Sequence, residues 1–279
     1  MKSYRIAVFS NAPNTGNQCL VYLANKVLTA SEMQSIAASS GLSEVAFIHL
    51  QRSRATLRIF SPFCEMLSCL HAALAACYVM QLEGLTVDLY LGGKVLALQH
   101  VNDEFAIKVP LLSDEAISQS VNIDIRIQFP DAVSLWSVTT ASHKLRLMIE
   151  YAYEKQISAI DASLFMDIKS LYPEIESFFT YASTTGSNTY VGRMFAPQLG
   201  IDEDPVNGNS CIALASILKK TKTDLTKLKV RQSQQCVVES TVGEDSAFVK
   251  ATCYVTEITY NDVNSFAFES TKEKIEYEI

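Results

Sequence analysis

The feature that most constrains the fold of this 279-residue chain is a near-repeat of a short motif. The sequence Arg-Ile-Phe-Ser-Pro at residues 58–62 returns as Arg-Met-Phe-Ala-Pro at residues 193–197. Each copy leads through a polar turn into a segment of small apolar residues, at 70–82 and 210–218, that is typical of a buried helix. Because such a helix lacks a polar face, protein must surround it, and a curved sheet can do so. The repeat therefore predicts two related halves.

We expect an α+β fold of two similar domains, each a curved, mostly antiparallel sheet or barrel wrapped around a central helix. The domains are placed at residues 1–118 and 119–279, and the last residues are candidates for pairing back with the first domain. Apolar spacing predicts a helix over residues 29–39 with Ser31 as its cap, and a strand is expected over residues 156–160.

Charge and apolar content exclude several classes of protein. The formal net charge is −7, from 30 acidic and 23 basic residues, and the basic residues form no long cluster. We therefore expect neither a nucleic-acid partner nor a membrane partner. No apolar stretch reaches the length of about 18 residues that suggests a membrane span, and the N-terminus lacks the apolar run of a signal peptide. These patterns predict a cytoplasmic protein.

The spacing of cysteines and histidines predicts neither a disulfide framework nor a metal site. The seven cysteines are an odd number and include no Cys-x-x-Cys pair, and the four histidines show no His-x-x-x-His spacing. A Gly-Gly pair at residues 92–93 is too short for a phosphate-binding loop. We expect no metal and no cofactor.

Polar residues stand where each of the two buried helices begins. Sliding the second turn onto the first pairs Asn207 with Cys69 and Asn209 with His71. The first backbone N–H groups of a helix lack intrahelical partners and favour an anion, so two helix starts facing one cleft would hold a carboxylate from both sides. The alternative is that both are ordinary caps, since Asn207 and Ser210 are good N-cap residues.

Further segments carry a family resemblance that spans nearly the whole chain. In order, they are Gly-Asn at residues 16–17, Leu-Ser-Glu-Val-Ala-Phe at 42–47, the stretch 58–76, Phe-Ala-Pro at 195–197, Gly-Ile at 200–201 and Glu-Asp-Pro-Val-Asn-Gly at 203–208. With them, the chain resembles the phenazine-biosynthesis PhzF-like isomerases, which share the diaminopimelate epimerase fold. Single motifs are weak, but these six in order and at fitting spacing are specific.

The resemblance implies a cofactor-independent isomerase that moves a proton on a small carboxylate-bearing substrate, by a double-bond shift or an epimerisation. It also implies a homodimer. By position, Glu44 matches the family's acid/base carboxylate, His71 its first-domain histidine and Asp204 its second-domain aspartate. The substrate-binding candidates on the same grounds are Gly16, Asn17, Cys69, Leu70, Asn207, Gly208 and Asn209.

Each candidate catalytic residue is also compatible with a purely structural role. Taken singly, Glu44 is compatible with a solvated strand start, His71 with a core histidine and Asp204 with a turn. The sequence also departs from the family inside its motifs, because Leu70 replaces a glycine and Asn209 replaces a serine. The substrate must therefore differ from that of the best-known member of the family. One alternative is a metabolite-binding protein that has lost catalysis.

Another alternative is an amino-acid racemase or epimerase assisted by Cys69, since two-thiol enzymes of this fold use one cysteine from each domain. Asn207 is the counterpart of Cys69 in the second half, and Cys211 lies about one helical turn further along. A symmetrical thiol pair is therefore absent from the sequence.

Overall fold

A computed structural model describes residues 1–12, 15–24, 26–101, 104–119, 123–233, 235–260 and 271–273 of the chain. It divides into two units, the first made of Met1–Ile107 and Ala251–Ile279 and the second of Lys108–Lys250. None of the helices in these described ranges is long and apolar enough to cross a membrane.

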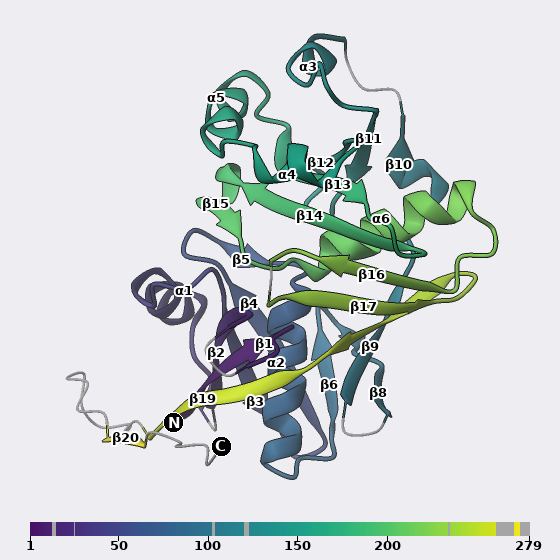
Figure 1. Ribbon diagram of the computed structural model, residues 1–279. Helices are drawn as coiled ribbons and strands as arrows, with labels where there is room; N and C mark the ends of the chain where they lie inside the picture. The colour runs from purple at the N-terminus through teal and green to yellow at the C-terminus, as the bar shows by residue number, and fades with distance from the viewer. Residues whose placement is uncertain are drawn as a thin grey trace. The chain divides into compact units, whose positions relative to one another are not determined.

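The first unit is a mixed sheet with a helix on each face (Figure 1). Its elements are β1 (Lys2–Val8), β2 (Asn17–Ala24), α1 (Ala30–Ser39), β3 (Val45–Leu50), β4 (Arg54–Phe60), β5 (Glu65–Met66), α2 (Leu70–Leu82), β6 (Asp88–Leu91), β7 (Lys94–Val95), β19 (Cys253–Tyr260) and β20 (Thr271–Glu273). The strands lie in the order β20-β19-β1-β2-β3-β4-β6-β7, and β5 pairs with β4. All neighbours are antiparallel except β2 with β3 and β4 with β6.

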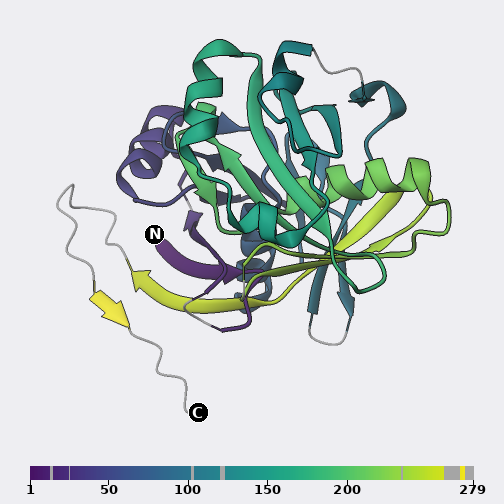
Figure 2. The same ribbon diagram turned by 45° about the horizontal axis from the view of Figure 1, so that its top comes forward.

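The two faces of this sheet are covered by different helices. Val45 and Phe47 of β3 belong to a core cluster with Met33 and Ala37 of α1, which lies beside the strands in Figure 2. Side chains alternate along a strand, so the intervening residues of β3 point to the other face, where α2 packs against β1, β2, β3 and β4. Most of the 13 residues of α2 are buried, as expected for a helix made of alanine and other apolar residues.

The second unit is also a mixed sheet with helices. Its elements are η1 (Asp114–Ala116), β10 (Ile117–Ser118), α3 (Ile123–Ile127), β11 (Ser134–Thr139), β12 (Leu145–Glu150), α4 (Glu154–Ser158), α5 (Ser163–Leu171), β13 (Ile175–Ser183), β14 (Thr189–Ala196), η2 (Pro197–Leu199), β15 (Ile201–Asp204), α6 (Gly208–Thr221), β16 (Lys227–Arg231), β17 (Val237–Val242) and β18 (Ser246–Ala251). The strand order is β10-β11-β12-β13-β14-β16-β17-β18, and β15 pairs with β14. β9 (Glu104–Pro110), where the chain passes between the units, pairs with β8 (Leu98–Val101).

The two units repeat one order of elements, which confirms the duplication predicted from the motif. In the first, β2 is parallel to β3 across α1, and β4 is parallel to β6 across α2. In the second, β12 is parallel to β13 across α4 and α5, and β14 is parallel to β16 across α6. A short strand, β5 or β15, folds back on the strand that carries the repeated motif. Each motif therefore ends the strand before a central helix.

Two local predictions were wrong. Helix α1 is capped by Thr29 rather than Ser31, because the Thr29 hydroxyl accepts from the N–H of Glu32 while the Glu32 carboxylate accepts from the N–H of Thr29. The strand expected over residues 156–160 does not form, because residues 156–158 are the last three residues of helix α4. Ile157 of α4 is buried in the core of the second unit, and Ile160, which follows the helix, is half-buried against the same core.

Candidate active site

An ion pair anchors the turn before each central helix. Arg58 Nε and Nη2 donate to the two carboxylate oxygens of Glu65 at 2.7 and 2.6 Å. Arg193 donates in the same way to Glu203, with both distances 2.7 Å. Such bidentate pairs fix orientation as well as distance. The arginine of the repeated motif therefore ties the strand to the turn that leads into the helix, in both units.

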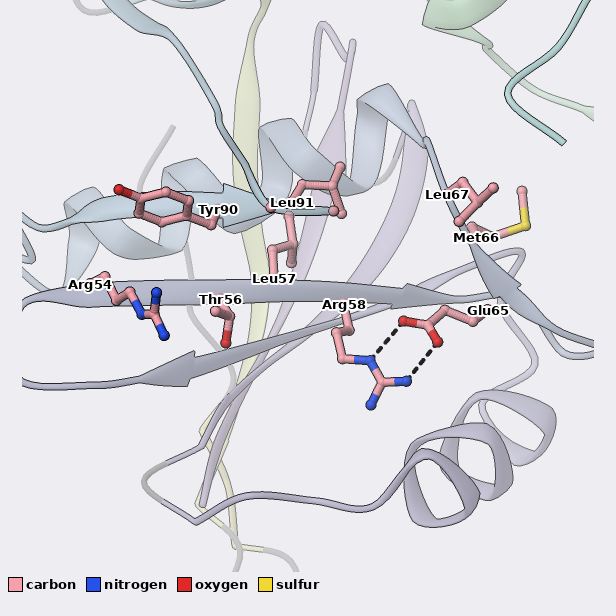
Figure 3. A pocket seen from close by; sticks show the side chains of 11 residues that line it. Arg54, Thr56, Leu57, Arg58, Glu65, Met66, Leu67, Tyr90 and Leu91 are labelled. Atoms are coloured by element: carbon pink, nitrogen blue, oxygen red, sulfur yellow. Dashed lines mark hydrogen bonds and ion pairs between the residues drawn. The ribbon is translucent and has the colours of Figure 1, made fainter.

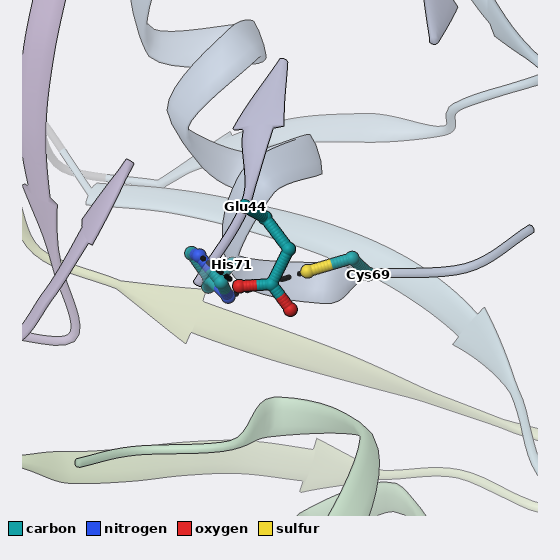
Figure 4. A group of neighbouring side chains, drawn as sticks. All are labelled: Glu44, Cys69 and His71. Carbon is teal, nitrogen blue, oxygen red and sulfur yellow. Dashed lines mark hydrogen bonds and ion pairs between the residues drawn. The ribbon is translucent and has the colours of Figure 1, made fainter. Parts of the chain in front are cut away.

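Three predicted residues meet where α2 begins in the first unit (Figure 4). Glu44 directly precedes β3, Cys69 is the N-cap residue of α2, and His71 lies in its first turn. His71 Nε2 is 3.5 Å from Glu44 Oε2, and His71 Nδ1 is 3.3 Å from Cys69 Sγ. Their exposed fractions are 4% for Glu44, 6% for Cys69 and 2% for His71. The solvated interpretation of Glu44 is therefore wrong.

A tight turn holds Asn17 against this cluster. Asn17 is buried, its Nδ2 lies 3.4 Å from His71 Nδ1, and its Oδ1 accepts from the Ser43 hydroxyl at 3.4 Å. Gly16 has φ +79°, and a Cβ there would lie 2.5 Å from the carbonyl oxygen of Val8. Only glycine fits both the conformation and the space. The Gly-Asn pair therefore places an amide beside the imidazole.

Burial raises the pKa of the Glu44 carboxyl above its ordinary value. Hydrogen bonds from the side chains of Ser43 and Cys69 lower it, but their effect is smaller than that of desolvation. Among the residues that the structure describes, none makes a hydrogen bond to Glu44 Oε2. The protonated form of this carboxyl is thus favoured more than it is in a solvated glutamate.

A second cluster lies where α6 begins in the second unit. Asp204 is 2% exposed, and its Oδ2 accepts from Asn207 Nδ2 at 2.9 Å. Asn207 is the N-cap residue of α6, and its Oδ1 accepts from the backbone N–H and the hydroxyl of Ser210 at 2.8 and 2.9 Å. The capping interpretation of Asn207 is therefore confirmed, and the same side chain also orients the carboxylate of Asp204.

Two residues that the sequence analysis did not select support this second cluster. The side chain of Gln232 forms two hydrogen bonds with the backbone of Asn207. Its Oε1 accepts from the N–H at 2.9 Å, and its Nε2 donates to the carbonyl at 3.1 Å. Arg146 is 7% exposed, and its Nε donates to Ser177 Oγ at 2.8 Å. Burial lowers the pKa of Arg146, while the charges of Glu176 and Asp204 raise it.

A charged residue inside the apolar run of β12, residues 145–149, was the signal that could have identified Arg146 from the sequence. The matching signal for Gln232 was weaker, because Gln232 is one of several polar residues that directly follow β16.

The remaining predicted residues lie at the starts of the same two helices. Leu70 is the first residue of α2 and is 7% exposed. Gly208 and Asn209 are the first two residues of α6, with Gly208 buried and Asn209 half-buried. The structure thus assembles the predicted residues as one cluster in each unit. Sequence spacing did not predict that Glu44, Cys69 and His71 would offer a metal three ligand atoms within 4.8 Å of one another.

An open groove of about 460 Å³ in the first unit lies over β4, β5 and β6 and contains none of the predicted site residues (Figure 3). Leu57, Met66 and Leu91 form part of its lining. Its Arg58 and Glu65 satisfy each other, so the groove presents no unpaired charge at that pair.

Most of the chain matches known proteins. A family model described as phenazine biosynthesis-like protein matches residues 6–250. The protein named Uncharacterized isomerase YddE of Escherichia coli (strain K12) is 31% identical over 230 residues, which cover 74% of this chain and 75% of that protein.

Solved structures show the same fold. A phenazine biosynthesis protein of the PhzF family from Enterococcus faecalis superposes with a TM-score of 0.76 at 22% identity, covering 92% of this chain and 97% of that chain. A probable proline racemase from Agrobacterium radiobacter K84 superposes with a TM-score of 0.65 at 12% identity, covering 95% of this chain and 94% of that chain. The diaminopimelate epimerase-like fold predicted from the sequence is therefore confirmed.

Proposed function

The chain belongs to the phenazine biosynthesis-like protein family and is an isomerase, and from this premise we propose that it moves a proton on a small carboxylate-bearing metabolite, with Glu44 as the general acid/base. One observation carries the proposal, namely that the buried carboxyl of Glu44 lies against the imidazole of His71 and the thiol of Cys69. A carboxyl has no packing role that would repay this burial, whereas proton transfer requires it.

The chemistry follows from the environment of Glu44. As carboxylate it accepts a proton from a substrate carbon, and as carboxylic acid it returns the proton to the same or a neighbouring carbon. Its raised pKa makes the carboxylate a stronger base than a solvated glutamate, which favours a residue that must take up a proton and then return it. No group besides the carboxyl has to carry the proton, so the reaction as proposed is cofactor-independent.

Charge that develops on the substrate requires fixed donors. We assign this role to His71 and Asn17 in the first cluster and to Asn207 and Asn209 in the second, with Asp204 as the second-unit catalytic carboxylate. Preorganised donors stabilise an emerging anion because they need not reorient during the reaction. Gly16, Cys69, Leu70 and Gly208 complete the proposed substrate-binding set.

The test is incorporation of deuterium into carbon. The full-length protein is incubated in deuterated water with a panel of cyclic and α-amino carboxylates, and exchange is followed by NMR. We expect exchange in at least one compound, and we expect it to be lost in Glu44→Gln while ligand binding persists. Asp204→Asn should reduce the same exchange, because Asp204 is proposed as a second catalytic carboxylate. Exchange that survives in Glu44→Gln contradicts the assigned role, and no exchange across the panel favours the metabolite-binding alternative.

A second candidate is a racemase in which Cys69 carries a proton, favoured by the 3.3 Å separation of its Sγ from His71 Nδ1. An imidazole at this distance can take the thiol proton and so create a nucleophilic, basic thiolate. Cys69→Ala distinguishes the two candidates. The racemase predicts loss of exchange in Cys69→Ala, whereas the Glu44 mechanism predicts that exchange is retained at a reduced rate.

A further inference from the structure

We propose that Glu44, Cys69 and His71 form a binding site for a thiophilic divalent cation, represented by Zn²⁺, and that the bound ion blocks Glu44 as a proton carrier. The block rests on the proposed function, whereas the binding itself does not. Sequence spacing did not indicate this site, because its carboxylate comes from residue 44 and its other two ligands from residues 69 and 71.

The ligand set and its geometry suit zinc. One carboxylate oxygen, one sulfur and one imidazole nitrogen lie within 4.8 Å of one another. Tetrahedral zinc with bonds of about 2.0–2.3 Å separates its ligands by about 3.4–3.6 Å. The sulfur of Cys69 is 3.3 Å from Nδ1 of His71, whereas the carboxylate oxygen of Glu44 is 3.5 Å from the other ring nitrogen, Nε2. One nitrogen can therefore share the ion with both neighbours only after a small shift of the imidazole or of the Glu44 carboxylate. Three protein ligands leave a fourth position for water or substrate.

Regular elements hold these ligands in place. Cys69 and His71 belong to the start of α2, Glu44 directly precedes β3, and α2 packs against β3. Loops would have to be ordered by the ion, but a helix start and a strand start are already positioned. The entropy lost on binding the metal is correspondingly small.

Charge balance favours the ion over a proton in this buried place. A carboxylate and a thiolate together neutralise Zn²⁺, so the complex with neutral His71 carries no net charge and avoids the cost of burying one. Binding releases the Cys69 thiol proton and, where Glu44 is protonated, its carboxyl proton as well, both to solvent. The oxygen of Glu44 that then binds the metal cannot accept a proton from carbon. Zinc should therefore inhibit the isomerase.

The thiolate ligand determines which ions bind. Soft sulfur and imidazole ligands favour zinc and cobalt, whereas magnesium and calcium prefer all-oxygen sites. Co²⁺ is the useful probe, because a cobalt–thiolate bond produces a charge-transfer absorption that reports the sulfur ligand directly. Cys64 is exposed and would offer a competing thiol, so the titration uses full-length protein carrying Cys64→Ser.

We expect one Co²⁺ per chain with a thiolate charge-transfer band, displaced by Zn²⁺ and unaffected by Mg²⁺. Cys69→Ser should abolish the band. The matched control is Cys77→Ser, since Cys77 is a buried thiol on the same helix outside the cluster, and this variant should keep the band. Glu44→Gln should weaken Zn²⁺ binding at least about tenfold. Circular dichroism verifies that each variant is folded.

The outcomes separate binding from inhibition. A missing band, a band that survives in folded Cys69→Ser, or equal losses in Cys69→Ser and Cys77→Ser would overturn the site. A normal band with deuterium exchange unaffected by one equivalent of Zn²⁺ would overturn the block alone. If the protein exchanges no substrate at all, the proposed function fails, but the cobalt spectrum still decides whether the site exists.

Discussion

Replacement of Gly16 by alanine tests whether the turn before β2 is set by backbone geometry. Gly16 has φ +79°, which costs an L-residue about 1–2 kcal/mol. The added Cβ would also lie 2.5 Å from the Val8 carbonyl oxygen and 2.7 Å from the Ser10 Cβ. Backbone cannot rotate aside as a flexible side chain can, so this overlap adds about 1–3 kcal/mol. We expect Gly16→Ala to lower the free energy of unfolding by about 2–5 kcal/mol.

Gly93→Ala is the matched control. Gly93 has the same φ of +79°, but no atom lies within 4 Å of its Cβ position. Both substitutions lower the entropy of the unfolded chain equally, so that contribution cancels in the comparison. The difference between the two variants therefore measures the overlap alone, and we expect about 1–3 kcal/mol.

Urea denaturation followed by far-UV circular dichroism is the appropriate assay. The single tryptophan, Trp136, lies in β11 of the second unit, so its fluorescence follows the unit that does not contain Gly16. Because Asn17 follows Gly16 and lies against His71, the displaced turn should also slow the proposed deuterium exchange. Equal destabilisation by Gly16→Ala and Gly93→Ala would refute the steric argument.

Two further predictions concern charged side chains. Since burial raises the folded-state pKa of Glu44, the stability that it contributes is present below its ordinary pKa and is lost as pH rises through the folded pKa. Glu44→Gln should therefore gain stability relative to the natural protein as pH rises above 4.5, the ordinary pKa of a glutamate, and a difference that is constant with pH in urea denaturation would contradict this. Arg193→Ala should cost about 1–3 kcal/mol, because Arg193 Nη1 also donates to two backbone carbonyls, at 3.0 and 2.8 Å. Arg58→Ala removes an ion pair with Glu65 whose side chains are 38% and 41% exposed, and it should lower the free energy of unfolding by about 0.2–1 kcal/mol. Thermal unfolding of the two arginine variants in parallel therefore tests whether the carbonyl contacts of Arg193 contribute to stability.

The fold was predictable because the signal was duplicated. The motif at residues 58–62 and its copy at 193–197 mark equivalent strand ends, and a small-residue helix follows each of them, as α2 and α6 do. The failures are local and have separate causes. At the start of α1, Thr29 and Ser31 can both act as caps, and the reciprocal hydrogen bonds with Glu32 select Thr29. Over a few residues, the strand and helix patterns at 156–160 overlap, and packing of Ile157 against the core decides between them.

The site was predictable to the extent that its residues lie close in sequence or match a motif. Cys69 and His71 share the start of α2, but their contact with Glu44 depends on how β3 packs against α2. Gln232 reaches Asn207 from the end of a strand 25 residues later, and Arg146 comes from a strand that precedes both. No spacing rule connects such positions, because the tertiary fold alone brings them together.

The duplicated helix starts have diverged chemically, and the divergence suggests a division of labour. Asn207 caps α6 with its side chain, orients Asp204 and has no proton to exchange, so this side chain is a fixed hydrogen-bonding group. Cys69 occupies the equivalent place on α2, where its side chain makes no capping hydrogen bond and contacts His71 instead. A group that moves a proton must lose and regain it, whereas a group that stabilises charge must stay as it is. Under the proposed mechanism, Glu44 and its neighbours therefore suit the transfer of the proton, and Asn207 suits the stabilisation of charge.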